Sequence, residues 1–491
     1  MIRARAITRI AGGASLLALG ALTATPAAAD SLRDALVSAY QTNPTLQAAR
    51  AQQRAVDEDV VIAKAQGLPQ VDVNSNYVEN IIISPNAFAA PQRVLRTGPL
   101  LTVPIYNGGA IKNATKAAKE RVSAGEADLR ATESAVFSQT VAAYMDVLRT
   151  EALVGLATNQ IEVLKVDLEA ARDRFQIGDL TITDVAQSDS RLALAEADLR
   201  AAFSDLIGAR ETYIRLVGRA PTNLEAPPPL PGLPENAAAA VEIALKYNPD
   251  LIAARERADA AGFDTKAAAA GRRPTLGLTT GVDYTNYFNT LGGPFADQLF
   301  QEETTSNMAL QLRIPLFQGG AISARYRQAG ARESAALEQM IATERDVIAQ
   351  TRSAYAAWQA SNAVIESSKQ AVAAAELSLE GVRAENSIGN RTVIEVLNAE
   401  QELLQARAQL VTARRNAYVA GFTLLAAMGR AEARDLNLDT GGPLYDPHEH
   451  YDKVHHDLWD FGRKPKPAPV STRTVDIPAP DATITPEEGS N

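Results

Sequence analysis

The chain has 491 residues, no cysteine and a formal net charge of −10 at pH 7. The lack of cysteine excludes disulfides and cysteine-ligated metal sites, and the acidic balance argues against nucleic-acid binding, which requires basic surfaces. Beyond the N-terminal segment the sequence has no run of about 18 apolar residues, so no helix is expected to span a membrane. Such a chain could enter a bilayer only as a closed barrel of strands.

Residues 1–29 have the composition of a secretory signal peptide. Three early arginines precede a short apolar run, and the small residues at 27–29 offer a cleavage site before Asp30. An ordinary buried helix is the alternative, disfavoured by the basic start and the Ala-x-Ala end. We therefore expect a secreted mature chain with a net charge of −13, since the segment removed contains three arginines and no acids.

The mature sequence contains the same unit twice. The pattern Asn-Pro-x-Leu-x-Ala-Ala-Arg occurs at 43–50 and again at 248–255, and a Pro-x-x-x-Gly-Gly-Ala-Ile segment occurs at 104–111 and at 315–322. Self-similarity of this length indicates an internal duplication. We expect a first repeat over 30–220, a proline-rich linker over 221–234, a second repeat over 235–430 and a partly disordered tail over 431–491.

Each half contains a long helix-forming segment and a return segment with a heptad pattern. Residues 109–176 and 320–387 lack proline and are rich in strong helix formers, so each predicts a helix of about 100 Å. In the return segments large apolar residues recur every seven positions, as at Val185, Leu192 and Leu199. This period indicates coiled coils; an amphipathic helix on a globular domain is the alternative, and its apolar period would drift towards 3.6.

Between these helices, apolar and polar residues alternate, which predicts two strands in each half. The apolar positions are Val71, Val73, Tyr77, Leu101, Val103, Ile105, Leu276, Leu278, Val282, Tyr284, Leu310, Leu312, Ile314 and Leu316. Alternation fits both a membrane barrel wall and a soluble sheet with one buried face. Four strands cannot enclose a lumen, so a membrane barrel would require several chains. Segments 79–97 and 285–307 are then the expected outer turns.

The repeated segments resemble the repeat openings and strand exits of the TolC family of outer-membrane efflux proteins, over about residues 31–430. The turn segments 174–178 and 386–392 are similar to the helix-to-helix turns of that family. The resemblance implies an α+β membrane protein. Three chains with four strands each would form a twelve-stranded transmembrane β-barrel, continued through the periplasm by a long coiled-coil α-helical barrel.

The resemblance also implies a function without catalysis or cofactors. The protein would be the trimeric outer-membrane exit duct of a tripartite efflux or type I secretion system in a Gram-negative bacterium. Its implied partners are two further copies of itself, a periplasmic adaptor, an inner-membrane ABC or RND transporter and outer-membrane lipid, with no nucleic acid. The adaptor would dock at the tip turns, through Ile177, Gly178, Ile388 and Gly389.

By the same resemblance, four residues near the tip form a latch that holds the closed state: Thr183, Asp184, Asn386 and Arg391. An aspartate and an arginine can form a bidentate, charge-assisted pair, and an exposed pair contributes only about 0–1 kcal/mol, which suits a latch that must release. The family often has an aromatic hydroxyl at the position of Asn386. The alternative is that Asp184 and Arg391 are solvated charges at helix starts.

Glu395 and Asn398 match the paired acidic rings of the family's pore constriction, one helical turn apart on one face. In a trimer Glu395 would form a ring of three carboxylates and Asn398 a neutral ring, which predicts a weaker cation preference than two acidic rings give. The alternative is that Glu395 is a solvent-facing residue on a helix.

All four histidines lie between His448 and His456. With the neighbouring acids they could form a metal site, but we favour a polar tail segment that packs on the helical barrel through Tyr451 and Trp459. No catalytic constellation is evident in the sequence, which disfavours a secreted enzyme. A periplasmic coiled-coil adaptor, the other alternative, does not account for four strands and a duplication.

Overall fold

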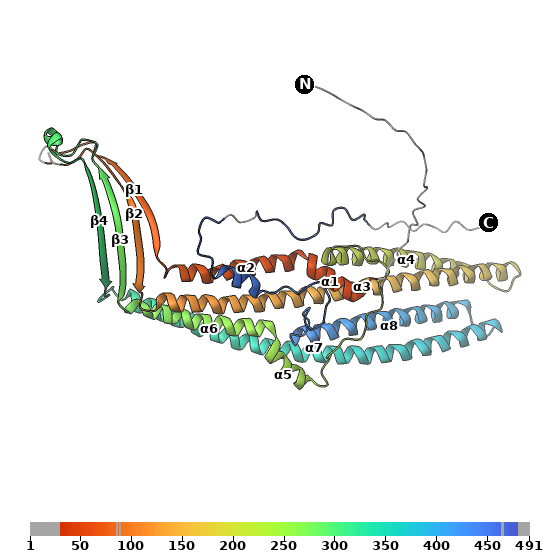
Figure 1. Cartoon of the computed structure of the whole chain (residues 1–491). Coiled ribbons are helices and arrows are strands. Elements are labelled where there is room, and N and C mark those ends of the chain that lie inside the picture. Colours follow the sequence, from red (N-terminus) through yellow and green to blue (C-terminus); the bar gives the residue numbers. More distant parts are fainter. Residues whose placement is uncertain (1–29, 85–86, 88–89, 463–465, 480–491) are drawn as a thin grey trace, which may run out of the picture.

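The computed structural model describes residues 30–84, 87, 90–462 and 466–479 (Figure 1). The predicted signal peptide and the last twelve residues lie outside this range. Four strands form a curved sheet at one end of the molecule, and the helices extend away from it as a long bundle (Figure 1). Among the described residues, none of the helices combines the length and apolar character needed to cross a membrane.

Each half begins with two short helices joined at an asparagine. In the first half Asn43 caps helix α2, and its side-chain amide donates to the carbonyl of Leu216 at 3.0 Å. In the second half Asn248 caps α6 and donates to Ala427 at 2.9 Å. The repeated Asn-Pro pair therefore begins one helix and attaches it to the end of another. The bounds are α1 Leu32–Thr42, α2 Pro44–Ala65, α5 Ala237–Tyr247 and α6 Pro249–Ala269, which is followed by the short 3₁₀ helix η2 Ala270–Arg272.

The long helices confirm the helices predicted from the proline-free segments and the heptads. They form two hairpins, α3 Ala110–Gln176 with α4 Ile182–Val217, and α7 Ala321–Ser387 with α8 Val393–Ala427. The two hairpins run side by side away from the sheet (Figure 1). Members of the predicted heptad series are buried along them, including Leu199, Leu206, Tyr213, Leu403 and Leu424.

The sheet has the order β1-β2-β3-β4 and is antiparallel throughout. Its strands are β1 Gln70–Glu79, β2 Arg93–Tyr106, β3 Thr275–Asn286 and β4 Glu302–Arg313. Val71 pairs with Leu101, Leu101 with Thr280, and Thr280 with Met308. Because directly paired residues point to the same face, this register collects the alternating apolar side chains on one face. That face is open in the single chain, since Val71 is 68% and Met308 75% exposed.

Three expected strand boundaries are wrong. The expected turns 79–97 and 285–307 are too long, because β2 begins at Arg93 and β4 at Glu302 and a short 3₁₀ helix, η3 Gly293–Gln298, occupies part of the second turn. The first residues of β4 are polar, and they pair with β3 without contributing to the apolar alternation on which the expectation was based. Ile314 and Leu316 lie beyond β4, which ends two residues before a proline that has no N–H for the ladder.

A hydrophobic core lies where the short helices meet the middle of the long ones. Phe137 and Tyr144 of α3 pack there with Tyr213 of α4 and Phe422 of α8. The Tyr144 hydroxyl lies 2.8 Å from the carbonyl of Asp30 and 2.7 Å from that of Glu225. The chain after α8 contributes Ala431, Ala433 and Leu438 to the same core, and a final short helix, α9 His448–Val454, follows.

Candidate functional site

The end of the bundle far from the sheet consists of two short turns, one in each hairpin (Figure 1). Gly178 has φ 82° and Gly389 φ 80°, a left-handed conformation that other residues adopt only with strain. The preceding residues, Ile177 and Ile388, are 80% and 71% exposed. The residues predicted to dock an adaptor therefore present apolar side chains at the outermost point of both hairpins.

The first turn leads into α4 through a capping box. The Asp184 carboxylate accepts hydrogen bonds from the backbone N–H of Thr181 at 3.0 Å and from its hydroxyl at 2.7 Å. These bonds hold the pKa of Asp184 below its usual range. Within the single chain Asp184 therefore has a helix-capping partner, and Thr183 is exposed on the first turn of α4.

The second turn contains the same capping arrangement with an arginine added. Glu395 accepts from the backbone N–H of Thr392 at 2.8 Å and forms an ion pair with Arg391 at 2.6 Å. Arg391 also pairs with Glu385 at 2.6 Å. The hydrogen bond from the Thr392 backbone and the contact with Arg391 lower the pKa of Glu395 to about 2, so Glu395 is ionised at neutral pH.

The four predicted latch residues lie on both hairpins. The Asn386 amide donates to the carbonyl of Arg391 at 2.7 Å, so these two residues are brought together by their own turn. Asp184 and Arg391 are not paired with each other; each bonds within its own hairpin.

Asn398 has a partner that sequence reasoning missed. The Arg191 guanidinium of α4 donates to the Asn398 side-chain oxygen of α8 at 2.7 Å. The two residues are 207 positions apart. No motif in the sequence indicates this pair, because neither residue belongs to the apolar heptad series.

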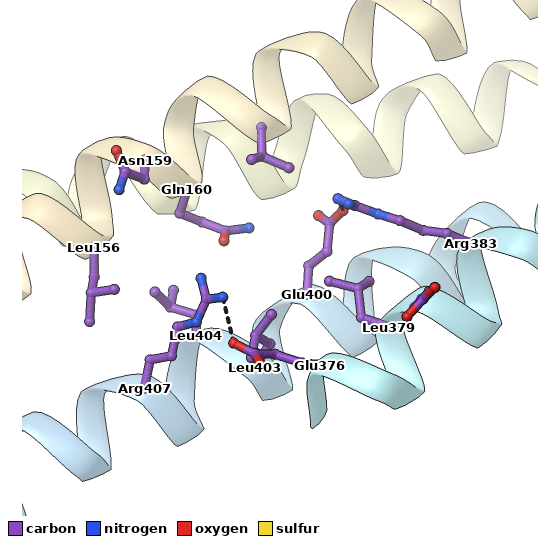
Figure 2. Close-up of a pocket in the computed structure, with 12 residues that line it drawn as sticks. Leu156, Asn159, Gln160, Glu376, Leu379, Arg383, Glu400, Leu403, Leu404 and Arg407 are labelled. Atoms are coloured by element: carbon purple, nitrogen blue, oxygen red, sulfur yellow. Dashed lines mark hydrogen bonds and ion pairs between the residues drawn. The ribbon is translucent and has the colours of Figure 1, made fainter. Parts of the chain in front are cut away.

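A groove of about 400 Å³ lies between the two hairpins, on the sheet side of the tip turns. It is lined by residues of α3, α7 and α8 (Figure 2). Figure 2 shows Glu400 and Arg383 pointing toward each other at one side of the groove, where their side chains pair at 2.5 Å. Arg407 and Glu376 form a second pair at 2.8 Å (Figure 2). The Glu400 side chain is 2% exposed, and burial raises its pKa to about 7. These residues were not predicted as functional.

The histidine segment packs on the helices near the sheet end. His450 Nδ1 lies 3.0 Å from the buried carboxylate of Asp57, and His448 Nδ1 lies 3.0 Å from Glu126. Tyr451 packs against the cluster that contains Val60, as expected, whereas Trp459 is 73% exposed and the expectation that it packs on the bundle is wrong. Within the described ranges no group of three or more His, Asp and Glu side chains could hold a metal ion.

Comparison with known proteins agrees with this architecture. The family model for outer membrane efflux proteins matches residues 35–219 and again 240–430. The outer membrane efflux protein BepC of Brucella suis is 32% identical over 459 residues, which cover 93% of this chain and 97% of BepC. The outer membrane protein TolC of Escherichia coli is 27% identical over 425 residues, 83% of this chain and 84% of TolC.

The fold is also that of a solved channel. The outer membrane protein VceC of Vibrio cholerae superposes with a TM-score of 0.69 at 22% identity, covering 81% of this chain and 96% of VceC. The matches extend over both hairpins and the sheet rather than over one motif. The chain therefore belongs to the outer membrane efflux proteins, the TolC family of non-catalytic outer-membrane channels.

Proposed function

We propose that three copies of this chain assemble into one exit duct, with a twelve-stranded barrel in the outer membrane and a helical barrel in the periplasm. The observation that carries the proposal is the sheet. Its outer strands, β1 and β4, have no second neighbour among the described residues, and its apolar face is exposed. Open strand edges are not tolerated in lipid, so the edges must be closed by other copies.

The duct would receive substrates from an inner-membrane pump, either an ABC or an RND transporter, through a periplasmic adaptor. Ile177 and Ile388 support docking of the adaptor at the tip, because they are apolar, exposed and held at the two turns by Gly178 and Gly389. The outer-membrane lipid would contact the apolar face of the sheet. We expect no nucleic-acid partner, because the chain is acidic and binding to phosphates requires a basic surface.

We also propose that the tip turns hold the closed state between copies. Thr183 and Asp184 of one chain would meet Arg391 of the next, with Asn386 keeping the second turn in shape. This role is supported by the exposure of Thr183 and Arg391 at the tip. Arg391 is also charged, so a trimer would present three such charges. Opening would then require Arg391 to give up its bonds to the neighbouring chain and to keep only the bonds with Glu385 and Glu395 of its own chain.

Glu395 and Asn398 would line the narrowest part of the duct. The low pKa of Glu395 supports a ring that stays charged over the physiological pH range. The two halves, 30–220 and 235–430, would supply equivalent hairpins to each third of the wall, joined by the linker 221–234 and braced by the tail 431–491. The common order of helices and strands in both halves supports this division.

A genetic experiment with matched variants tests the function. Deleting the gene is expected to abolish export of a protein to the medium or to raise drug susceptibility, and the wild-type chain should restore it. Met308→Arg places a charge on the apolar face of β4 and should fail to restore export, since arginine facing lipid costs about 2–4 kcal/mol. Asn307→Arg, on the opposite face, should restore it. Normal export and susceptibility without the gene would contradict the proposal.

A further inference from the structure

Arg191 and Asn398 form a direct side-chain link between the return helices of the two hairpins. Arg191 Nη2 donates to Asn398 Oδ1 at 2.7 Å, and Asn398 is exposed. Asn398 lies three residues after Glu395 on α8, so the two side chains face the same side of that helix. An arginine from α4 is thus held next to the proposed constriction.

The Arg191 guanidinium is charged, whereas the side chain that accepts its hydrogen bond, Asn398, is neutral. An arginine side chain remains protonated in proteins, and within the described part of the chain Arg191 has no ion pair. The groove around it is lined by apolar residues such as Leu194 and Leu397, with Asp198 as the acid on the same helix. Arg391, in contrast, pairs with Glu385 and Glu395 at 2.6 Å each.

We propose that Arg191 is a specificity-determining residue of the channel, because its guanidinium, held on Asn398, places a fixed positive charge at the narrowest part of the pore. The inference rests on the proposed function, since it requires a trimeric pore with Asn398 at its constriction. Three copies would bring three such charges around one axis. They offset the ring of Glu395 carboxylates, repel cations and admit anionic substrates.

Single-channel recording in planar bilayers under a potassium chloride gradient tests the assignment. Arg191→Gln removes the charge but keeps an amide that can donate to Asn398. Its channels should prefer potassium over chloride more strongly than wild type, by about twofold or more in the permeability ratio. Arg191→Lys keeps the charge and should retain the wild-type ratio. An unchanged ratio in Arg191→Gln, or an equal increase in both variants, would overturn the assignment.

Two controls separate this inference from the proposed function. Arg200→Gln removes the same charge from an exposed site on α4, nine residues further and on the opposite face of the helix, and should leave the ratio unchanged. Glu395→Ala should lower the potassium preference. If Glu395→Ala has no effect, the constriction lies elsewhere. The proposed constriction residues and the proposed role of Arg191 are then both refuted. If wild-type protein forms no channels, the duct itself is refuted; if only Arg191→Gln is silent, this inference alone fails.

Discussion

Glu400 illustrates how one buried carboxyl group couples the two hairpins. It projects from α8 towards Arg383 of α7, and the carboxyl group of Asp167 on α3 contributes to the rise of its pKa. Among the described residues, Glu400 Oε2 and Asp167 Oδ2 have no hydrogen-bond donor. A proton on Glu400 would supply the missing donor, because a protonated carboxyl group can donate to a carboxylate. The proton would then hold α3 and α8 together.

This arrangement predicts a pH dependence with a defined sign. The pKa of Glu400 is raised from 4.5 to about 7 in the folded protein, so the folded state binds the proton more tightly than the unfolded state. The free energy of unfolding should therefore decrease as pH rises from about 4.5 to about 7. Glu400→Gln is neutral at every pH and should show a smaller decrease.

Thermal unfolding of the detergent-solubilised protein, followed by its helical circular dichroism across this pH range, measures the effect. Glu376→Gln is the matched control, because Glu376 is an exposed glutamate paired with an arginine on the neighbouring helix, and it should retain the wild-type slope. Equal slopes for wild type and Glu400→Gln would show that Glu400 does not carry the proton.

At the residue scale the sequence indicates which residues lie in the candidate site better than it indicates which side chains they contact. The resemblance points to Arg391 and Glu395, but it does not predict that Arg391 pairs with both Glu385 and Glu395. Nor does it indicate Arg191 or Glu400. Their contacts connect different helices, and the side-chain geometry at a helix crossing depends on the packing of the whole bundle.

The long helices are determined by local sequence properties, whereas the position of the tail is determined by tertiary contacts. The long helices follow from local properties, namely the absence of proline, strong helix formers and a seven-residue period, so their bounds could be predicted closely. The segment α9 has seven residues and no periodic signal. It is held by tertiary contacts, with His450 on Asp57 and Tyr451 against Val60, and these contacts could not be predicted from local sequence.

At the element scale we predict that His450 fastens α9 to α2. Asp57 is fully buried and its carboxylate receives hydrogen bonds from Gln53 at 2.9 Å and from His450 at 3.0 Å. His450→Ala leaves one of these oxygens without a partner, which should cost about 1–3 kcal/mol. The tail after residue 440 should then be cut faster by a protease, as measured by limited proteolysis and mass spectrometry.

His456→Ala is the matched control for this experiment. His456 is exposed and contacts the ring of His455 rather than a buried acid, so its removal should leave the cleavage rate unchanged. If the tail of His450→Ala resists the protease as well as wild type, the fastening role of His450 is refuted.

At the scale of the whole molecule, the single chain leaves a sheet with an exposed apolar face and two open edges. The number of strands predicted from the sequence already indicates that one chain cannot enclose a passage. The expectation that three chains assemble rests on the family resemblance. The hairpins are joined within the chain by contacts such as Arg415 of α8 with Asp146 of α3, at 2.8 Å. In the proposed duct, one chain supplies a curved wall segment whose sides meet other copies.

The size of the purified mature protein in detergent tests the central claim most directly. Light scattering corrected for bound detergent should give the mass of three chains, and the complex should migrate as a heat-sensitive band that converts to one chain on boiling. The protein should precipitate when the detergent is removed, because the apolar faces of β1 and β4 would be exposed to water. A single chain that stays in solution without detergent would contradict a shared duct.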